Sequence, residues 1–213
     1  MKFAFLIYDG FTLLDLAGPI DVFRAWPGAE PYYVALSDAQ VTCDSGVIIS
    51  PTASLESLRD PDVIVIPGSD RPDLLGADVP LTRWLREKGP SATWVTSVCT
   101  GAFLLARAGL LQGKRATTHW AFREELALLG VDVVSDRVVI DGQIVTAAGV
   151  SSGIDMALTL LGREMGDTVA QMSQLAIEYD PQPPYNCGSP DKAGATLTKT
   201  TKSLLAALGA ERE

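Results

Sequence analysis

The sequence predicts an α/β protein with a mainly parallel central sheet and helices on both of its faces. Short apolar runs alternate with segments of helical spacing along most of the chain, which is the pattern of a parallel sheet. The run at residues 62–68, DVIVIPG, is continuous and β-branched, as in strands buried on both faces. No internal repeat, low-complexity block or long linker interrupts the 213 residues, so we expect one domain.

The individual elements follow from the same periodicity. Strands are predicted at residues 2–8, 32–37, 46–51, 62–68 and 92–98. Helices are predicted at residues 12–26, 80–89, 100–111, 122–130, 151–166 and 167–179, with a weakly helical polar piece at 194–210. Asp141-Gly142, between two apolar runs, predicts a hairpin within residues 131–149. Gly18-Pro19 is expected to interrupt or steer the first helix.

Composition restricts the classes of function. With 47% hydrophobic and 20% charged residues, the chain can bury a substantial core. Its net charge of −9 argues against a nucleic-acid partner. Three cysteines without C-x-x-C spacing and a single histidine argue against a disulfide framework, a structural zinc site and a multi-histidine metal centre. The apolar runs are too short to span a membrane, so we expect a cytoplasmic protein that binds no membrane.

The expected ligand site lies at the carboxyl ends of the strands, where open α/β sheets bind their ligands. The first strand is not followed by G-x-G-x-x-G, and no Walker A sequence is present, so no nucleotide cofactor is predicted. The loops that follow the strands therefore hold the candidate residues. They comprise residues 9–15, 67–69, 97–101 and 117–120.

Cys99 is the first candidate, because it lies where the strand at 92–98 gives way to a helix. A thiol at a helix N-terminus faces free backbone N–H groups and the positive end of the helix dipole, so we expect a lowered pKa and a reactive thiolate. Gly101 allows the close approach that a hydrolase-type nucleophile elbow needs, although Val98 departs from that motif. The alternative is a small apolar residue packed under the helix.

Asp15 and the Gly68-Ser69 pair are the next candidates. Asp15 is flanked by Leu14 and Leu16, so its carboxyl is expected in an apolar pocket with a raised pKa, as a proton donor or acceptor. A capping or solvent-facing role is the alternative. The backbone N–H groups of Gly68 and Ser69 are expected to point into the same pocket as an oxyanion hole does, unless the segment is a plain strand-ending turn.

Four segments together resemble the ThiJ/PfpI superfamily, which has a class I glutamine-amidotransferase-like fold. They are YDGFTLLDLAGPIDVF, VIVIPGS, WVTSVCTGAFLLARAGLLQGKRATTHW and EYDPQPPYNCGSP. The resemblance runs from residue 2 to about residue 191, which gives a family-like domain at 1–191 and a helical tail of the same domain at 192–213. It implies a flavodoxin-like three-layer sandwich, usually homodimeric, with Cys99 as the nucleophile on the elbow.

Within the superfamily, the segments are most similar to the subgroup that hydrates isonitriles to N-substituted formamides. This resemblance implies a thioimidate on Cys99, Asp15 as general acid and base, and no metal or organic cofactor. Thr100 matches the residue that the subgroup uses after the nucleophile, and its side chain is expected to orient the Asp15 carboxylate or the water molecule. Gly68 and Ser69 match a pair that supplies a backbone donor. His119 is expected near the substrate, as a structural or substrate-shaping residue.

Two departures separate the chain from other branches of the superfamily. Thr100 stands where the peptidases have a histidine. His119 is followed by Trp120 and Ala121, so it does not form the His-x-Glu pair of amidotransferases. Two alternatives to the hydratase remain. One is a non-enzymatic small-molecule or redox sensor with an oxidisable Cys99. That sensor would lack the DNA-binding domain of the AraC-type regulators, which share the cysteine motif. The other is a glyoxalase-like enzyme acting on reactive carbonyls. Cys43 and Cys187 have no predicted role.

Overall fold

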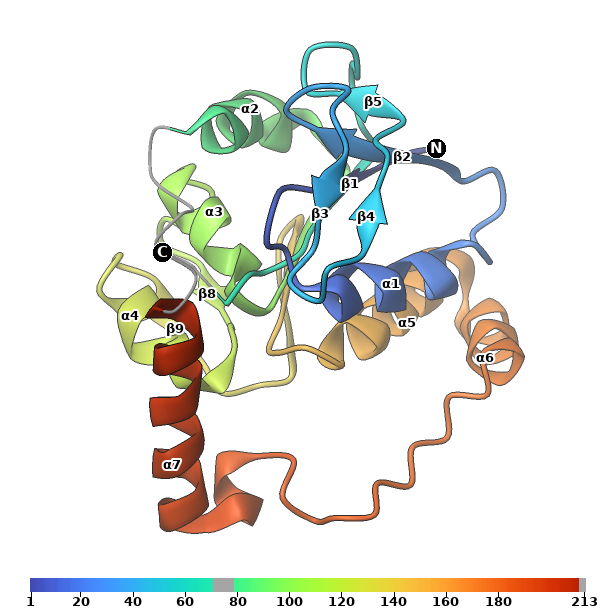
Figure 1. Cartoon of the computed structure of the whole chain (residues 1–213). Helices are drawn as coiled ribbons and strands as arrows, with labels where there is room; N and C mark the ends of the chain where they lie inside the picture. Colours follow the sequence, from blue (N-terminus) through green and yellow to red (C-terminus); the bar gives the residue numbers. More distant parts are fainter. Residues whose placement is uncertain (71–78, 211–213) are drawn as a thin grey trace.

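The computed structural model describes residues 1–70 and 79–210 and has three layers, with a central sheet between two helical layers (Figure 1). Within these residues the main sheet has seven strands in the order β10-β11-β7-β6-β1-β2-β5. The strands are β1 Lys2–Leu6, β2 Glu30–Ala35, β5 Ala53–Ser54, β6 Val63–Ile66, β7 Trp94–Val98, β10 Val138–Asp141 and β11 Ile144–Ala147. All neighbours pair in parallel except β10 and β11, which form the predicted hairpin. The flavodoxin-like sandwich is confirmed.

Side-chain alternation along β1 divides the core between the two faces of the sheet. Phe3 and Phe5 point to one face and Ala4 and Leu6 to the other, as the two-residue period of a strand requires. The first face is covered by α1 Leu13–Phe23, α5 Ser152–Met165 and α6 Asp167–Ala176. The second is covered by α2 Pro80–Lys88, α3 Ala102–Arg107 and α4 Arg123–Ala127. Both faces are therefore sealed, which explains the continuous apolar strands.

Several boundaries differ from the prediction. The first helix continues through Pro19. Gly18 permits close packing of α5, because a Cβ there would lie 2.8 Å from Ile154. The predicted strand at 46–51 is reduced to β4 Ile48–Ile49, which pairs with β3 Val41–Thr42 in a separate small sheet. The short strands β5, β8 Arg115–Ala116 and β9 Asp132–Val133 were not predicted.

The C-terminal part of the chain leaves the sandwich after α6. Residues 177–189 run as an extended segment, and α7 Pro190–Ala210 then lies beside α4, where Lys202 Nζ is 3.1 Å from Glu124 Oε2 (Figure 1). The tail is helical from Pro190, earlier than predicted, with a non-helical kink at Gly194. Among the described residues, no helix has the length and apolar character needed to cross a membrane.

Candidate active site

The chain makes a sharp turn at Cys99, between the end of β7 and the 3₁₀ turn η3 Cys99–Gly101. Cys99 has φ 57°, in the left-handed region that residues with a Cβ rarely adopt. The Thr118 hydroxyl donates to the Cys99 carbonyl oxygen at 2.8 Å and thereby fixes the turn. Such a strained position persists only where surrounding contacts hold it, and such positions cluster at functional sites. The predicted elbow conformation is confirmed.

Two glycines allow the end of β6 to approach the elbow. A Cβ at Gly101 would lie 2.5 Å from the Ile66 carbonyl oxygen, and a Cβ at Gly68 would lie 2.6 Å from Thr100 N and 2.9 Å from Cys99 Cβ. These distances are shorter than van der Waals contact, so neither position has room for a larger residue. The glycines therefore bring the 66–69 segment directly against the cysteine turn.

Asp15, in the first turn of α1, is fully buried beside this turn. Its Oδ2 accepts a hydrogen bond from Gly68 N–H at 2.8 Å, whereas its Oδ1 is buried with no partner among the described residues. Burial raises the pKa of Asp15 from 3.8 to about 8, the Gly68 N–H opposes this rise, and the charge of Asp44 adds to it. The predicted raised pKa is confirmed. Because Oδ2 acts as an acceptor, the proton of the neutral acid resides on Oδ1.

The expected lowering of the Cys99 pKa is wrong. Burial raises the pKa of the thiol well above its usual value, and the neighbouring Asp15 raises it further, although the backbone and side chain of Thr100 act in the opposite direction. The side chain is only 6% exposed, and the turn that follows it is a short 3₁₀ segment, so loss of hydration outweighs the helix dipole. Below pH 8 the site therefore holds a neutral thiol next to a neutral acid.

Thr100 holds the 68–69 segment in place through both functions of its hydroxyl. The fully buried Oγ1 accepts from Ser69 N–H at 2.7 Å and donates to the Ser69 carbonyl oxygen at 2.6 Å. The hydroxyl hydrogen is thus used within the protein. Thr100 consequently positions Ser69, and the expectation that its side chain orients the carboxylate or a water molecule is corrected.

The expected oxyanion donors are also corrected. The N–H of Gly68 is bound by Asp15 and the N–H of Ser69 by Thr100, so both amides hold side chains of the site. The backbone N–H of Thr100 instead faces the Cys99 sulfur and favours its negative charge. This is the amide directly after the nucleophile, which forms part of the oxyanion hole in hydrolase elbows.

Replacing Thr100 with valine is expected to lower the free energy of unfolding by about 1–3 kcal/mol, because the buried Ser69 N–H and C=O lose their partner. Urea denaturation checks this value. Thr100→Ser keeps the hydroxyl and serves as the matched control, with a smaller loss. If both variants unfold at the same urea concentration as the wild type, the two Ser69 hydrogen bonds do not stabilise the site.

Tyr8 belongs to the site but was not identified from sequence. Its hydroxyl donates to the Pro67 carbonyl oxygen at 2.7 Å. Burial raises its pKa well above the ordinary value, and the nearby Asp15 and Cys99 raise it further. The sequence prediction placed Tyr8 inside the first strand, but β1 ends at Leu6. Tyr8 therefore lies in the loop at the carboxyl edge of the sheet, where functional residues are expected.

His119 lines a neighbouring cavity of about 430 Å³, here called the His119 pocket. Its Nδ1 accepts from Ala121 N–H at 3.4 Å, and burial, followed by the charge of Arg123, lowers its pKa to about 4. The imidazole is therefore neutral at physiological pH. The walls of the pocket are formed by Leu14, His119, Trp120, Arg123, Ser135, Arg137, Ala148, Gly149, Val150, Ser151, Gly188, Ser189 and Pro190.

Three residues that line the His119 pocket follow or precede, in sequence, residues that contact the cysteine turn. Leu14 precedes Asp15, and His119 follows Thr118, whose hydroxyl binds the Cys99 carbonyl. Ala148 follows β11, whose last residue pairs with the residue before Cys99. The pocket is thus lined by residues that neighbour those of the cysteine turn in sequence or in the sheet, whereas Cys99 and Asp15 themselves are not among its lining residues. In the described part of the chain, no group of three or more His, Cys, Asp or Glu side chains is arranged to hold a metal ion.

In this site the buried Cys99 thiol lies on a strained strand-to-helix turn, and Gly68 lies between this turn and the Asp15 carboxyl. This arrangement defines a cysteine-elbow protein of the α/β sandwich class. Residues 1–163 match the DJ-1/PfpI family model, and the chain belongs to this family. It is 42% identical over 197 residues to the isonitrile hydratase of Pseudomonas putida, covering 92% of this chain and 86% of that protein.

Two further relatives show how widely the fold is used. The crystal structure of a ThiJ/PfpI family protein from Pseudomonas syringae superimposes with a TM-score of 0.92 at 38% identity, covering 98% of this chain and 87% of that one. The HTH-type transcriptional regulator CdhR of Pseudomonas aeruginosa is 29% identical over 189 residues, covering 84% of this chain and 54% of the regulator. The proteins that are similar to this chain therefore include both an enzyme and a regulator.

Proposed function

We propose that the protein is an isonitrile hydratase that converts R–N≡C and water to the N-substituted formamide R–NH–CHO. The observation that carries this proposal is the neutral Asp15 carboxyl in side-chain contact with the Cys99 thiol, with an Oδ1 that has no nitrogen or oxygen partner among the described residues. The identity to the Pseudomonas putida isonitrile hydratase supports the choice of substrate class. The isonitrile group is uncharged, and its terminal carbon must gain both a proton and a nucleophile. A neutral acid beside a thiol supplies both.

In the first half-reaction, Asp15 Oδ1 donates its proton to the terminal carbon of the isonitrile. The Cys99 sulfur bonds to the same carbon, and the thiol proton passes to Asp15, which regains its neutral form. The product is the thioimidate R–N=CH–S-Cys99. In the net change, the sulfur and the hydrogen of the thiol are both added to the isonitrile carbon. The Thr100 N–H stabilises the negative charge that develops on the sulfur as its proton leaves.

In the second half-reaction, water attacks the thioimidate carbon. Asp15 donates its proton to the thioimidate nitrogen and takes a proton from the attacking water, so it is neutral again when the tetrahedral species R–NH–CH(OH)–S-Cys99 has formed. Collapse of this species breaks the C–S bond, releases R–NH–CHO and returns the proton to sulfur. Tyr8 and Thr100 keep the 67–69 segment fixed through both steps.

Incubation with cyclohexyl isocyanide tests the proposal, with N-cyclohexylformamide as the expected product. Methylglyoxal, run in parallel, tests the glyoxalase-like alternative. Formamide from the first substrate and no consumption of the second support the hydratase. Binding of isonitrile without turnover would instead favour a small-molecule sensor.

A redox sensor is disfavoured by the buried, high-pKa thiol, because oxidisable cysteines are accessible and have a low pKa.

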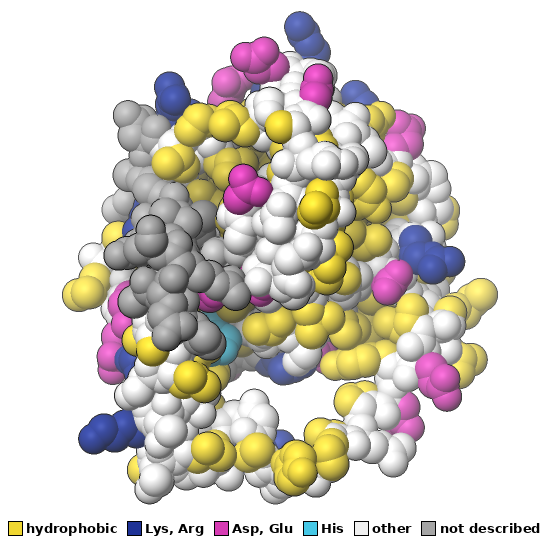
Figure 2. Space-filling view, in the orientation of Figure 1, with side chains coloured by type: hydrophobic (Ala, Val, Ile, Leu, Met, Phe, Trp, Pro, Cys, Tyr) yellow, Lys and Arg dark blue, Asp and Glu magenta, His cyan; other side chains and the backbone are white. Residues whose placement is uncertain are grey.

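We also propose that the protein forms a homodimer. Large apolar side chains are exposed on α6 and the extended segment, where Met172 is 66%, Leu175 81% and Tyr185 77% exposed. Figure 2 shows this segment standing away from the body of the molecule, with an open space between them. We expect light scattering after size exclusion to give twice the chain mass for the wild type and a lower value for Leu175→Glu. A wild-type monomer would contradict the proposal.

A further inference from the structure

The His119 pocket is positively charged, although the chain as a whole is acidic. The described residues of its walls include two arginines and no Asp or Glu, whereas the chain carries 26 acidic and 17 basic residues. His119 adds no charge because its pKa is about 4. The charge of the pocket therefore depends on Arg123 and Arg137, and on whether each of them is already paired.

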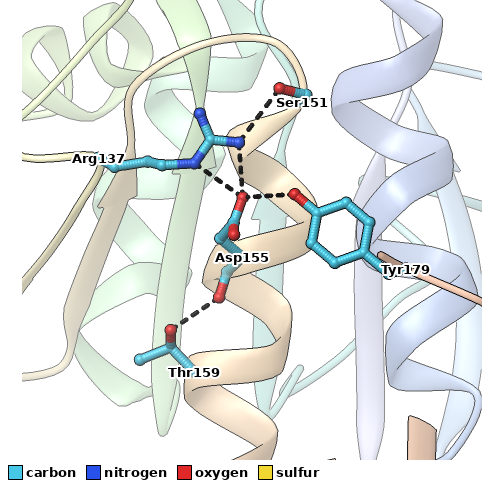
Figure 3. Close-up of polar contacts among 5 residues, drawn as sticks. All are labelled: Arg137, Ser151, Asp155, Thr159 and Tyr179. Carbon is cyan, nitrogen blue, oxygen red and sulfur yellow. Dashed lines mark hydrogen bonds and ion pairs between the residues drawn. The ribbon is translucent and has the colours of Figure 1, made fainter. Parts of the chain in front are cut away.

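Arg137 is paired, as Figure 3 shows. Its Nε and Nη2 donate to Asp155 Oδ2 at 2.8 and 2.6 Å, and Nη2 also donates to Ser151 Oγ at 3.2 Å. The Tyr179 hydroxyl donates to the same Asp155 oxygen at 3.1 Å. The carboxylate neutralises the guanidinium, so Arg137 forms a fixed wall of the pocket rather than a free cation.

Arg123 is not paired with an acid in the described part of the chain. Its one hydrogen bond within the described chain runs from Nη2 to the Ser135 carbonyl oxygen at 3.2 Å, and its Nε is buried without a partner. The adjacent Glu124 and Glu125 are directed to Lys202, at 3.1 and 4.0 Å. A partly buried guanidinium with unused donors and no counter-charge is a favourable site for a carboxylate.

We infer that the His119 pocket binds a carboxylate on the non-reacting end of the substrate, through Arg123, while the isonitrile group reaches Cys99. This inference rests on the proposed function and specifies its substrate class as isocyano carboxylates. The pocket volume of about 430 Å³ accommodates a small organic acid. Leu14, Trp120 and Val150 supply an apolar wall for the connecting carbons.

The experiment compares isocyanoacetate with its neutral methyl ester. We expect the wild type to hydrate the carboxylate with the higher kcat/KM. Arg123→Gln should lower kcat/KM for isocyanoacetate by about 10- to 100-fold, the range of a charge-assisted hydrogen bond, and leave the methyl ester nearly unchanged. Arg123→Lys should retain part of the preference. Arg24→Gln removes the same charge from an arginine with a 76% exposed side chain and should leave both substrates unaffected.

The outcomes separate this inference from the proposed function. Equal or faster hydration of the methyl ester by the wild type, or equal losses for both substrates in Arg123→Gln, would overturn the inference and keep the hydratase. If the wild type hydrates cyclohexyl isocyanide but neither of these two substrates, the inference is overturned and the hydratase is kept. If it hydrates no isonitrile, the proposed function fails, and calorimetric titration with N-formylglycine then decides the anion site. Binding that is lost in Arg123→Gln supports the site, and absent or unchanged binding overturns it.

Discussion

Replacing Cys99 with alanine is expected to lower the rate of isonitrile hydration by at least about 10³-fold, because the proposed thioimidate forms on the Cys99 sulfur next to Asp15. The measurement is formamide release from cyclohexyl isocyanide under saturating substrate. Cys187→Ala, which removes an exposed thiol outside the site, is the matched control and should retain the wild-type rate. Comparable rates for Cys99→Ala and the control would remove Cys99 from the chemistry.

The loss in Cys99→Ala is expected without unfolding. Alanine keeps a Cβ at φ 57°, so the backbone strain of the turn is unchanged, and only the sulfur is removed from a small buried volume. We expect a change of about 1 kcal/mol or less in the free energy of unfolding, which circular dichroism during urea denaturation measures. An unfolded variant would make its inactivity uninformative, and Cys99→Ser then provides the second substitution at the same position.

Replacing Asp15 with asparagine is expected to lower the hydration rate by about 10²- to 10⁴-fold, the usual contribution of a general acid and base. The wild type needs the protonated carboxyl, so its rate should fall as the pH rises through about 8, the pKa of Asp15. The residual rate of Asp15→Asn should not show this decline. A wild-type rate that is constant between pH 6 and 10 would show that the proton does not come from Asp15.

The same substitution predicts a change in stability with pH. The folded pKa of Asp15 is raised from 3.8 to about 8, so its contribution to stability is fully present below pH 4 and is lost as the pH rises to about 8. Over this range the carboxyl ionises in the unfolded chain but not in the folded one. The free energy of unfolding of Asp15→Asn should therefore fall less between pH 4 and 8. Asp21→Asn, on the same helix and exposed, is the control and should follow the wild type.

The periodicity of apolar residues predicted those helices and strands that are long enough to show a repeating pattern. The buried strands β6 and β7 and the β10-β11 hairpin were expected from continuous apolar runs and from Asp141-Gly142. The two-residue strands β5, β8 and β9 were not expected, because two residues carry no alternation and their pairing is set by tertiary contacts.

The candidate site was predicted in position but not in its electrostatics. Cys99, Asp15 and Gly101 lie where the strand-to-helix pattern places them. The sign of the Cys99 pKa shift could not be read from the sequence, because burial depends on the packing of both neighbouring layers. For the same reason, the sequence indicated amides at Gly68 and Ser69 but not that Asp15 and Thr100 already occupy them.

Mass spectrometry of the protein, quenched in acid during turnover of cyclohexyl isocyanide, tests most directly whether Cys99 carries the reaction. We expect the peptide that contains Cys99 to gain the mass of one isonitrile, the thioimidate, at short reaction times and to lose it once the substrate is consumed. The peptides of Cys43 and Cys187 should stay unmodified. Steady formamide production with no adduct on Cys99, and an undiminished rate in Cys99→Ala, would contradict covalent catalysis by this cysteine.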